Sequence, residues 1–282
     1  MLISDHVNKL RNYMEFRNYS KNSIDNYCSN FNGFLSHFQK LGVTHPDRIN
    51  SEMVVDFLKQ YKEPATHSGY HSAIKIYYSK IARVGIEKFK YIERPKRNKK
   101  LPIVLSQEEV QKMFSVCENT KHLVMLALLY SCGLRVSELI NLKWKDIDRS
   151  RMIINIIQAK GNKDRQVMLS ESLLPLLEKY CREYKLEKST YVLTGQNNAD
   201  QYSSSSVGQV MKQLAEKAGI NKRVYTHLMR HNCFTHMVEN GTDINLIQRL
   251  AGHSNVKTTA LYTHISHNLI SKIKSPLENI QL

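Results

Sequence analysis

The chain has 282 residues, of which 41% are hydrophobic and 23% are charged. This composition excludes a globally disordered protein, and no stretch reaches the ~18 consecutive apolar residues of a transmembrane helix. Lysine and arginine together number 41 against 25 aspartates and glutamates, for a net charge of +16. Such a charge favours a polyanionic partner, most commonly nucleic acid, and a basic protein without such a partner is the alternative.

The first residues and the cysteines indicate the compartment. The N-terminal segment is charged from the start and lacks the apolar stretch of a secretory signal, so we expect a cytoplasmic protein. The five cysteines are far apart and none has the CxxC spacing, which argues against a disulfide framework and a cysteine zinc site. We expect reduced thiols and no bound metal.

Residues 1–92 are predicted to form an all-helical domain. Apolar side chains recur there at helical spacing in four segments, at 7–14, 24–38, 53–61 and 70–81. Asn50 or Ser51 is the candidate N-cap of the third helix. The tyrosines and phenylalanines lie on the apolar faces, so we assign them to the core rather than to base stacking.

A strongly basic segment follows and is predicted to be a linker at 93–103. Its sequence RPKRNKK has basic residues around a proline and almost no apolar side chain, so it cannot form a core. An extended linker between two domains, in contact with phosphates, is the interpretation, and a solvated surface loop is the alternative. The candidate DNA-binding side chains are Arg94, Lys96, Arg97, Lys99 and Lys100.

Residues 104–282 are predicted to be mostly helical with a small antiparallel sheet. A capping box at 106–109 opens a helix that continues through 122–130, and Gly133 separates it from a helix at 135–142. Segments 152–158 and 166–169 flank a turn and predict a β-hairpin, with 191–193 as a third short strand. The remaining predicted helices are at 171–184, 206–218, 227–239, 243–250, 256–263 and 267–273.

Four short clusters in this second part contain candidate functional residues, and each has an ordinary explanation by itself. These are an ion pair with Glu138, a solvated lysine at the hairpin tip, a histidine that caps a helix and a tyrosine in the core. Two histidines in HLMRH share a helical face, but the HExxH glutamate is missing, so zinc is disfavoured. The candidates are Arg135, Lys160, His227, Arg230, His253 and Tyr262.

Together, these residue types match the needs of phosphodiester cleavage by a tyrosine without a metal. Two guanidinium groups can neutralise the non-bridging oxygens and stabilise the transition state. Forming the phenolate of a free tyrosine at pH 7 costs about 4 kcal/mol, which a neighbouring base or arginine and histidine donors must offset. A lysine on the hairpin can protonate the departing alkoxide.

The six candidates in this order, with the sequences GLRVSEL, HLMRH, LAGHSNVKTT and LYTHI, resemble the tyrosine recombinase (phage integrase) family. The resemblance covers the whole chain, and the compact size is similar to that of Xer-type recombinases and small mobile-element integrases. It implies a SAM-like core-binding domain at 1–92 and a catalytic domain at 104–282. Met229 stands where the family usually has leucine, a volume-conserving change, and Glu138 matches an acidic position that orients Arg135 or a partner.

The resemblance also implies the reaction and the partners. Tyr262 would attack a scissile phosphate of double-stranded DNA, form a 3′-phosphotyrosyl link and release a 5′-hydroxyl, with no cofactor. Four protomers, or this chain with a paralogous recombinase, would pass through a Holliday junction at the nucleoid, with or without an accessory protein. Chromosome dimer resolution, integration and excision, and inversion stay open. The alternatives are a non-catalytic DNA-binding regulator and a relaxing topoisomerase.

Overall fold

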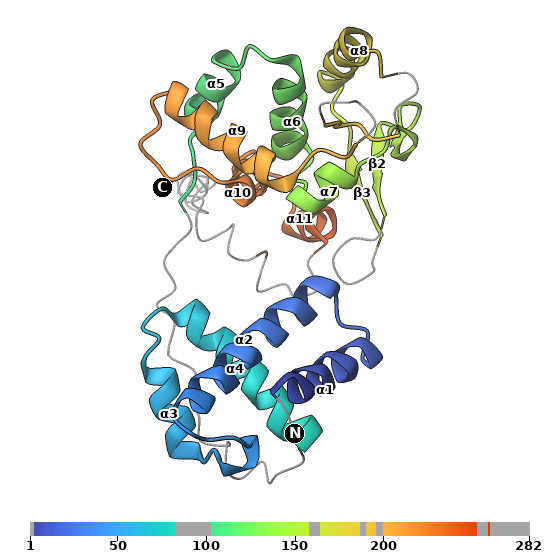
Figure 1. The fold of residues 1–282 in the computed structure, drawn as a ribbon. Helices are drawn as coiled ribbons and strands as arrows, with labels where there is room; N and C mark the ends of the chain where they lie inside the picture. The colour runs from blue at the N-terminus through green and yellow to red at the C-terminus, as the bar shows by residue number, and fades with distance from the viewer. Residues whose placement is uncertain are drawn as a thin grey trace, which may run out of the picture. The chain divides into compact units, whose positions relative to one another are not determined.

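The computed structural model describes residues 3–82, 103–157, 164–186, 190–195, 200–252 and 259. The chain divides into two compact units, Met1–Lys100 and Leu101–Leu282 (Figure 1). Almost all of the predicted linker and, apart from residue 259, both helices predicted after residue 255 lie outside the described residues, so they stay predictions. None of the helices in the described ranges is long and apolar enough to span a membrane.

The first unit contains the four predicted helices. They are α1 (Ile3–Phe16), α2 (Lys21–Lys40), α3 (Ser51–Lys59) and α4 (Pro64–Ile76), with a turn of π-helix (η2) at Tyr77–Ala82. Asn50 is the N-cap of α3, and its side chain accepts from the Met53 backbone N–H at 2.9 Å. Phe31, Phe34 and Phe57 are buried and pack against one another or against Tyr77 and Tyr78, which confirms their assignment to the core.

The second unit opens with the predicted capping box. The Ser106 side chain accepts from the Glu109 backbone N–H, and the Glu109 carboxylate accepts from the Ser106 N–H. The single long helix predicted after it is wrong, because two helices are present, α5 (Gln107–Ser115) and α6 (Thr120–Ser131). Asn119 starts the second helix by accepting from the His122 backbone N–H at 3.1 Å.

The hairpin prediction is confirmed in an antiparallel sheet of three strands. These are β1 (Ile147–Asp148), β2 (Ile153–Ile156) and β3 (Arg165–Met168), and Ile154 pairs with Val167. The third strand predicted at 191–193 is wrong, since Tyr191 makes only an isolated bridge to Lys143. Val192 and Leu193 are fully buried but lie in an irregular segment, so they pack in the core without forming a strand.

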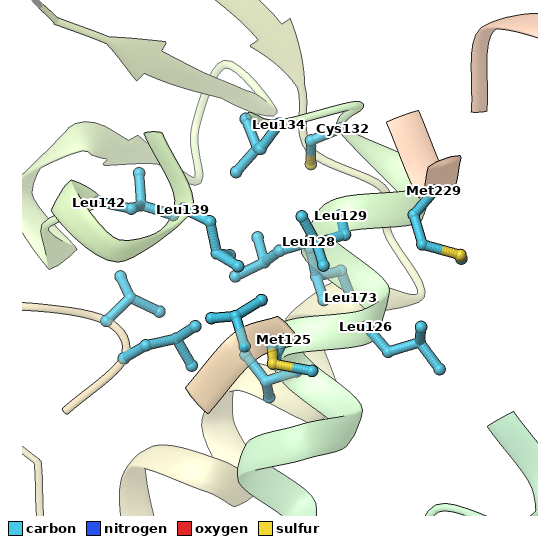
Figure 2. Close-up of a cluster of buried hydrophobic side chains, with 14 of the residues drawn as sticks. Met125, Leu126, Leu128, Leu129, Cys132, Leu134, Leu139, Leu142, Leu173 and Met229 are labelled. Atoms are coloured by element: carbon cyan, nitrogen blue, oxygen red, sulfur yellow. The ribbon is translucent and has the colours of Figure 1, made fainter. Parts of the chain in front are cut away.

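The core of the second unit surrounds α6, where Leu126, Leu128 and Leu129 are completely buried (Figure 2). Helices α7 (Val136–Asn141), α8 (Leu173–Tyr184), α9 (Ser204–Lys217), α10 (Thr226–Glu239) and α11 (Ile244–Ala251) complete the described part. Helix α10 packs against α6, α9 and α11 and is buried on most of its surface. A helix so placed brings its polar side chains into the interior of the domain, where they need partners.

Two polar side chains of α10 hold the start of the second unit. The Leu105 backbone N–H donates to Asn232 Oδ1 at 3.1 Å, and His236 Nε2 donates to the Leu105 carbonyl at 2.9 Å. Because a carbonyl can only accept, Nε2 of His236 carries the hydrogen, and Nδ1 lies 2.8 Å from the Tyr130 hydroxyl. Both backbone groups of Leu105 are thus bound to one helix.

Candidate active site

Arg135 is placed by the turn between α6 and α7. Gly133 in this turn has a left-handed conformation with φ +58°, which residues with a Cβ rarely adopt. The ring of Phe234 fills the adjoining space, since a Cβ on Gly133 would lie 2.6 Å from its Cζ. The turn therefore requires glycine for two reasons, and it places Arg135 at the N-cap of α7.

Glu138 binds Arg135 through both its backbone and its side chain. The carboxylate accepts from the Arg135 backbone N–H at 2.7 Å, as the third residue of a capping box does, and from Nη1 at 2.7 Å. Only 5% of the Glu138 side chain is exposed, so this is a buried ion pair and not the surface pair considered above. These two hydrogen bonds fix the Arg135 side chain relative to its own backbone, as the predicted orienting role of Glu138 requires.

A second arginine, Arg165, completes the cluster. It lies at the start of β3, and its Nη1 and Nη2 donate to the two oxygens of Glu138 at 2.5 and 2.8 Å. Its Nε donates to the Leu250 carbonyl at 2.8 Å. Arg165 is not among the functional residues predicted from the sequence. The available signal was a basic residue at the base of the hairpin, five positions after Lys160, and such residues are common beside polar turns.

The two arginines control the charge of the Glu138 carboxyl. Burial by itself raises the pKa of this group, but hydrogen bonds from Arg165 and Arg135 outweigh burial and lower the pKa to about 2. The carboxylate accepts four hydrogen bonds, which matches its lone-pair capacity. Glu138 is therefore charged over the whole physiological range of pH.

Arg230 lies in the interior on α10, with 1% of the residue exposed. Its Nη1 and Nη2 donate to the carbonyl oxygens of Gly133 and Ala251. The guanidinium carbon also lies 4.9 Å from the centre of the Phe234 ring, a cation–π distance. These partners fix the guanidinium of Arg230 against the same turn that places Arg135.

The C-terminal end of α11 brings the three arginines together. Leu250 accepts from Arg165, and the carbonyl of Ala251 accepts from Arg230 and from Arg135 Nη2, the latter at 3.3 Å. The last carbonyls of a helix lack partners within the helix and form the negative end of its dipole, so cations are favoured there. Gly252 then ends α11 in a left-handed conformation. Two of the predicted residues, Arg135 and Arg230, are thus brought together.

His227 lies exposed in the first turn of α10. Its ring meets that of His231 one turn later, with centroids 4.7 Å apart and an angle of 82° between the planes. Burial lowers the pKa of His231 to about 4, and the charges of His227 and Arg230 add to the effect. Within the described ranges, no group of three His, Cys, Asp or Glu side chains is arranged to hold a metal ion.

Lys160, His253 and Tyr262 lie outside the described residues, so their places in the site stay predictions. Their neighbours along the chain are described. Strand β2 ends at Ile156 and β3 begins at Arg165, on either side of the segment that contains Lys160. Helix α11 and its cap Gly252 lead directly to His253.

The described cluster can bind an anion. It has three guanidinium groups and one carboxylate, so its charge is positive. Arg135 is 19% exposed, and its contacts with described residues use two of its five N–H groups. The remaining N–H groups of Arg135 suit the paired hydrogen bonds that a phosphate oxygen accepts.

Known proteins of one family match both units of the chain. Residues 104–268 match the phage integrase family, and residues 7–87 match the phage integrase N-terminal SAM-like domain. The chain is 34% identical over 265 residues to tyrosine recombinase XerA of Pyrococcus horikoshii, covering 93% of this chain and 90% of that one. It is 33% identical over 269 residues to tyrosine recombinase XerD of Oceanobacillus iheyensis, covering 89% and 90%.

Solved structures show the same fold. A crystal structure of XerA recombinase matches with a TM-score of 0.56 at 28% identity and covers 96% of both chains. XerH recombinase bound to a palindromic difH substrate matches with a TM-score of 0.75 at 23% identity, covering 93% of this chain and 82% of that one. The two family matches and the relatives above 30% identity confirm the resemblance found in the sequence. The chain belongs to the phage integrase family of site-specific tyrosine recombinases.

Proposed function

We propose that Tyr262 is the nucleophile that cuts DNA at a specific site. Its phenolic oxygen attacks the scissile phosphorus and forms a 3′-phosphotyrosyl bond, while the P–O5′ bond breaks and leaves a 5′-hydroxyl. The 5′-hydroxyl of a partner strand then attacks the phosphotyrosyl group and restores the tyrosine. The phosphodiester bond energy stays in the covalent intermediate, so the reaction needs no external energy source.

The observation that carries this proposal is the convergence of Arg135 and Arg230 on the carbonyl of Ala251. Attack on a phosphodiester adds negative charge to the non-bridging oxygens, and preorganised guanidinium groups stabilise that charge. Arg135 has the exposure to reach such an oxygen. Arg230 is held by two carbonyls, so its contact with a phosphate would follow a rearrangement of these bonds when DNA binds.

The roles of the other candidate residues are proposed from the chemistry of their side chains. Lys160 donates a proton to the leaving 5′-oxygen, because an alkoxide is a poor leaving group. His227 and His253 donate hydrogen bonds to the phosphate or to the developing phenolate. Glu138 does not touch the substrate in this scheme but keeps Arg135 in the required orientation.

The assembly is proposed from the relatives. One solved neighbour, at 16% identity and a TM-score of 0.77, is a lambda integrase tetramer bound to a Holliday junction. By analogy, four copies of this chain, or this chain with a paralogous recombinase, would act on two DNA sites. The linker residues Arg94, Lys96, Arg97, Lys99 and Lys100 would contact the backbone, and the tail after Tyr262 would dock on a neighbouring protomer or on its own domain.

A nicked suicide substrate tests the nucleophile. Such a substrate loses a short fragment after cleavage, so the protein–DNA adduct accumulates and survives SDS. Tyr262→Phe should abolish the adduct and leave DNA binding intact. Tyr19→Phe is the matched control, because Tyr19 is exposed and lies in the other unit, and it should give an adduct of normal yield.

Three results would contradict the proposal in different ways. An adduct of normal yield from Tyr262→Phe would refute the assignment of Tyr262. The absence of an adduct from the unaltered protein on its own DNA site would favour a binding regulator. Relaxation of supercoiled DNA that lacks the site, without recombination, would favour a topoisomerase.

A further inference from the structure

We propose that Arg165 is a positioning residue of the active site, which holds Glu138 and, through Glu138, the phosphate-binding Arg135. This inference rests on the proposed function. Arg165 belongs to β3, whereas Glu138 and Arg135 belong to α7 and its N-cap. Removal of Arg165 would therefore affect a phosphate contact that Arg165 does not itself make.

The contact between Arg165 and Glu138 has the geometry of a paired guanidinium–carboxylate interaction. Nη1 and Nη2 each donate to a different oxygen of Glu138, at 2.5 and 2.8 Å. A planar fork on a planar carboxylate fixes the rotation of the carboxylate as well as its position. The same two oxygens receive the backbone N–H and Nη1 of Arg135, so the orientation that Arg165 imposes is passed on to Arg135.

Burial separates Arg165 from a phosphate-binding role. Its side chain is 6% exposed, against 19% for Arg135. Three of its N–H groups are bound to Glu138 and to the Leu250 carbonyl. Two of these donors bind the charged Glu138 carboxylate, a stronger acceptor than the two neutral carbonyls that hold Arg230, so the guanidinium of Arg165 stays with Glu138 when DNA binds.

The absence of a side chain at Gly252 leaves room for the Arg165 side chain. A Cβ on Gly252 would lie 3.0 Å from Cδ of Arg165, closer than ordinary van der Waals contact. Gly252 also has φ +60° as the C-cap of α11. The glycine that ends α11 thus lets Arg165 reach both the Leu250 carbonyl and Glu138.

Two substitutions separate geometry from charge. Arg165→Gln removes the cation, and Arg165→Lys keeps the cation but cannot bind both oxygens and the Leu250 carbonyl with one planar group. Both variants should cut a nicked suicide substrate about 10–100-fold more slowly in a single turnover, because small misplacements of a catalytic group have effects of this size. Arg149→Gln is the matched control, since it breaks an exposed ion pair with Glu178 and should leave the rate unchanged.

Three further measurements identify the route of the effect. The slope of DNA affinity against salt should stay that of the unaltered protein in Arg165→Lys and Arg165→Gln, because no phosphate contact is lost. A 5′-bridging phosphorothioate, whose leaving group needs no proton, should not restore either variant. In a Glu138→Gln background, Arg165→Gln should change the cleavage rate by less than about 3-fold, because the residue acts through Glu138.

The outcomes distinguish this inference from the proposed function. If the unaltered protein forms no adduct, the proposed function fails. If it forms the adduct and Arg165→Lys and Arg165→Gln cut at the normal rate, Arg165 has no positioning role. A lowered salt slope would make Arg165 a DNA-contacting residue, and rescue by sulfur would place its action on the leaving group. Should Arg165→Gln fail to fold, the Glu138→Gln/Arg165→Gln double variant removes the buried carboxylate that has lost one of its two cations, and a rate well below that of Glu138→Gln would overturn the inference.

Discussion

Arg135 and Arg230 donate to the same oxygen, the carbonyl of Ala251 at the end of α11. The two residues are 95 positions apart in the sequence, and no local interaction relates them. Their surroundings differ, because Arg135 is partly exposed and Arg230 is buried. Substitution at the two positions should therefore affect stability unequally, although both should reduce strand cleavage.

Arg230→Ala should lower the free energy of unfolding by about 2–4 kcal/mol, because the Gly133 carbonyl loses its donor and the Ala251 carbonyl keeps only the longer bond from Arg135. Arg135→Ala should lower it by only about 1 kcal/mol, since Arg165 still pairs with Glu138. Urea denaturation of the two variants provides the measurement. Equal losses of stability would show that Arg230 is not fixed by these carbonyls.

Gly133→Ala should destabilise the catalytic unit by about 2–4 kcal/mol, from left-handed strain and the clash with Phe234. Gly219→Ala is the matched control, because Gly219 has φ +66° and open space around its Cβ position. It should cost about 1–2 kcal/mol, from the backbone alone. If Phe234 causes the difference, Phe234→Leu should cost less in the Gly133→Ala protein than in the unaltered one. Identical losses for the two alanine variants would remove Phe234 from the explanation.

His231 should make the stability depend on pH between about 6.5 and 4. Burial lowers its pKa in the folded protein to about 4 from the ordinary 6.5, so the unfolded chain binds a proton in this range that the folded chain does not. The free energy of unfolding should therefore decrease as the pH falls from 6.5 to 4. Above 6.5 the contribution is complete.

His231→Gln should weaken this dependence, which urea denaturation at pH 7 and pH 5 would measure. The histidines whose pKa is likewise lowered by burial, His6, His67 and His122, are common to both proteins and cancel in the comparison. Glu138, with a pKa of about 2, titrates at lower pH. A His231→Gln protein with an unchanged slope would show that His231 is not held neutral.

Lys160 and Arg230 should respond differently to a 5′-bridging phosphorothioate. Sulfur is a far less basic leaving group than oxygen, so it bypasses the need for a general acid. The cleavage rate of Lys160→Ala should recover substantially on this substrate, and that of Arg230→Ala should recover little. Equal recovery of both variants would refute the division of roles.

Most of the fold could be predicted from the sequence because its signals are local. Helices with an apolar face and a polar cap, such as α3 after Asn50 and α5 after Ser106, carry both signals within a few residues. The break between α5 and α6 is not evident in the sequence, because apolar residues continue at Val116 and Cys117 and only the cap residue Asn119 marks the start of α6. A short apolar run such as 191–193 does not distinguish a strand from an irregular buried segment.

The candidate site was predictable only in part. Arg135, Glu138 and Arg230 lie in short motifs whose residue types match the chemistry. The pairing of Arg165 with Glu138 joins residues 27 positions apart and exists only in the folded protein. The burial of Arg230 has the same origin, because it depends on how α10 packs against α6 and α11.

The two hydrogen bonds of the Leu105 backbone determine which part of the second unit resists a force applied along the chain. A pull on the backbone that arrives from the preceding residues reaches the exposed bond from Lys222 to the Val104 carbonyl and then the two buried side chains Asn232 and His236. Both belong to α10, the helix that also carries His227 and Arg230. Residue 105 therefore cannot be displaced without either breaking two hydrogen bonds or moving the helix that holds two of the proposed catalytic side chains.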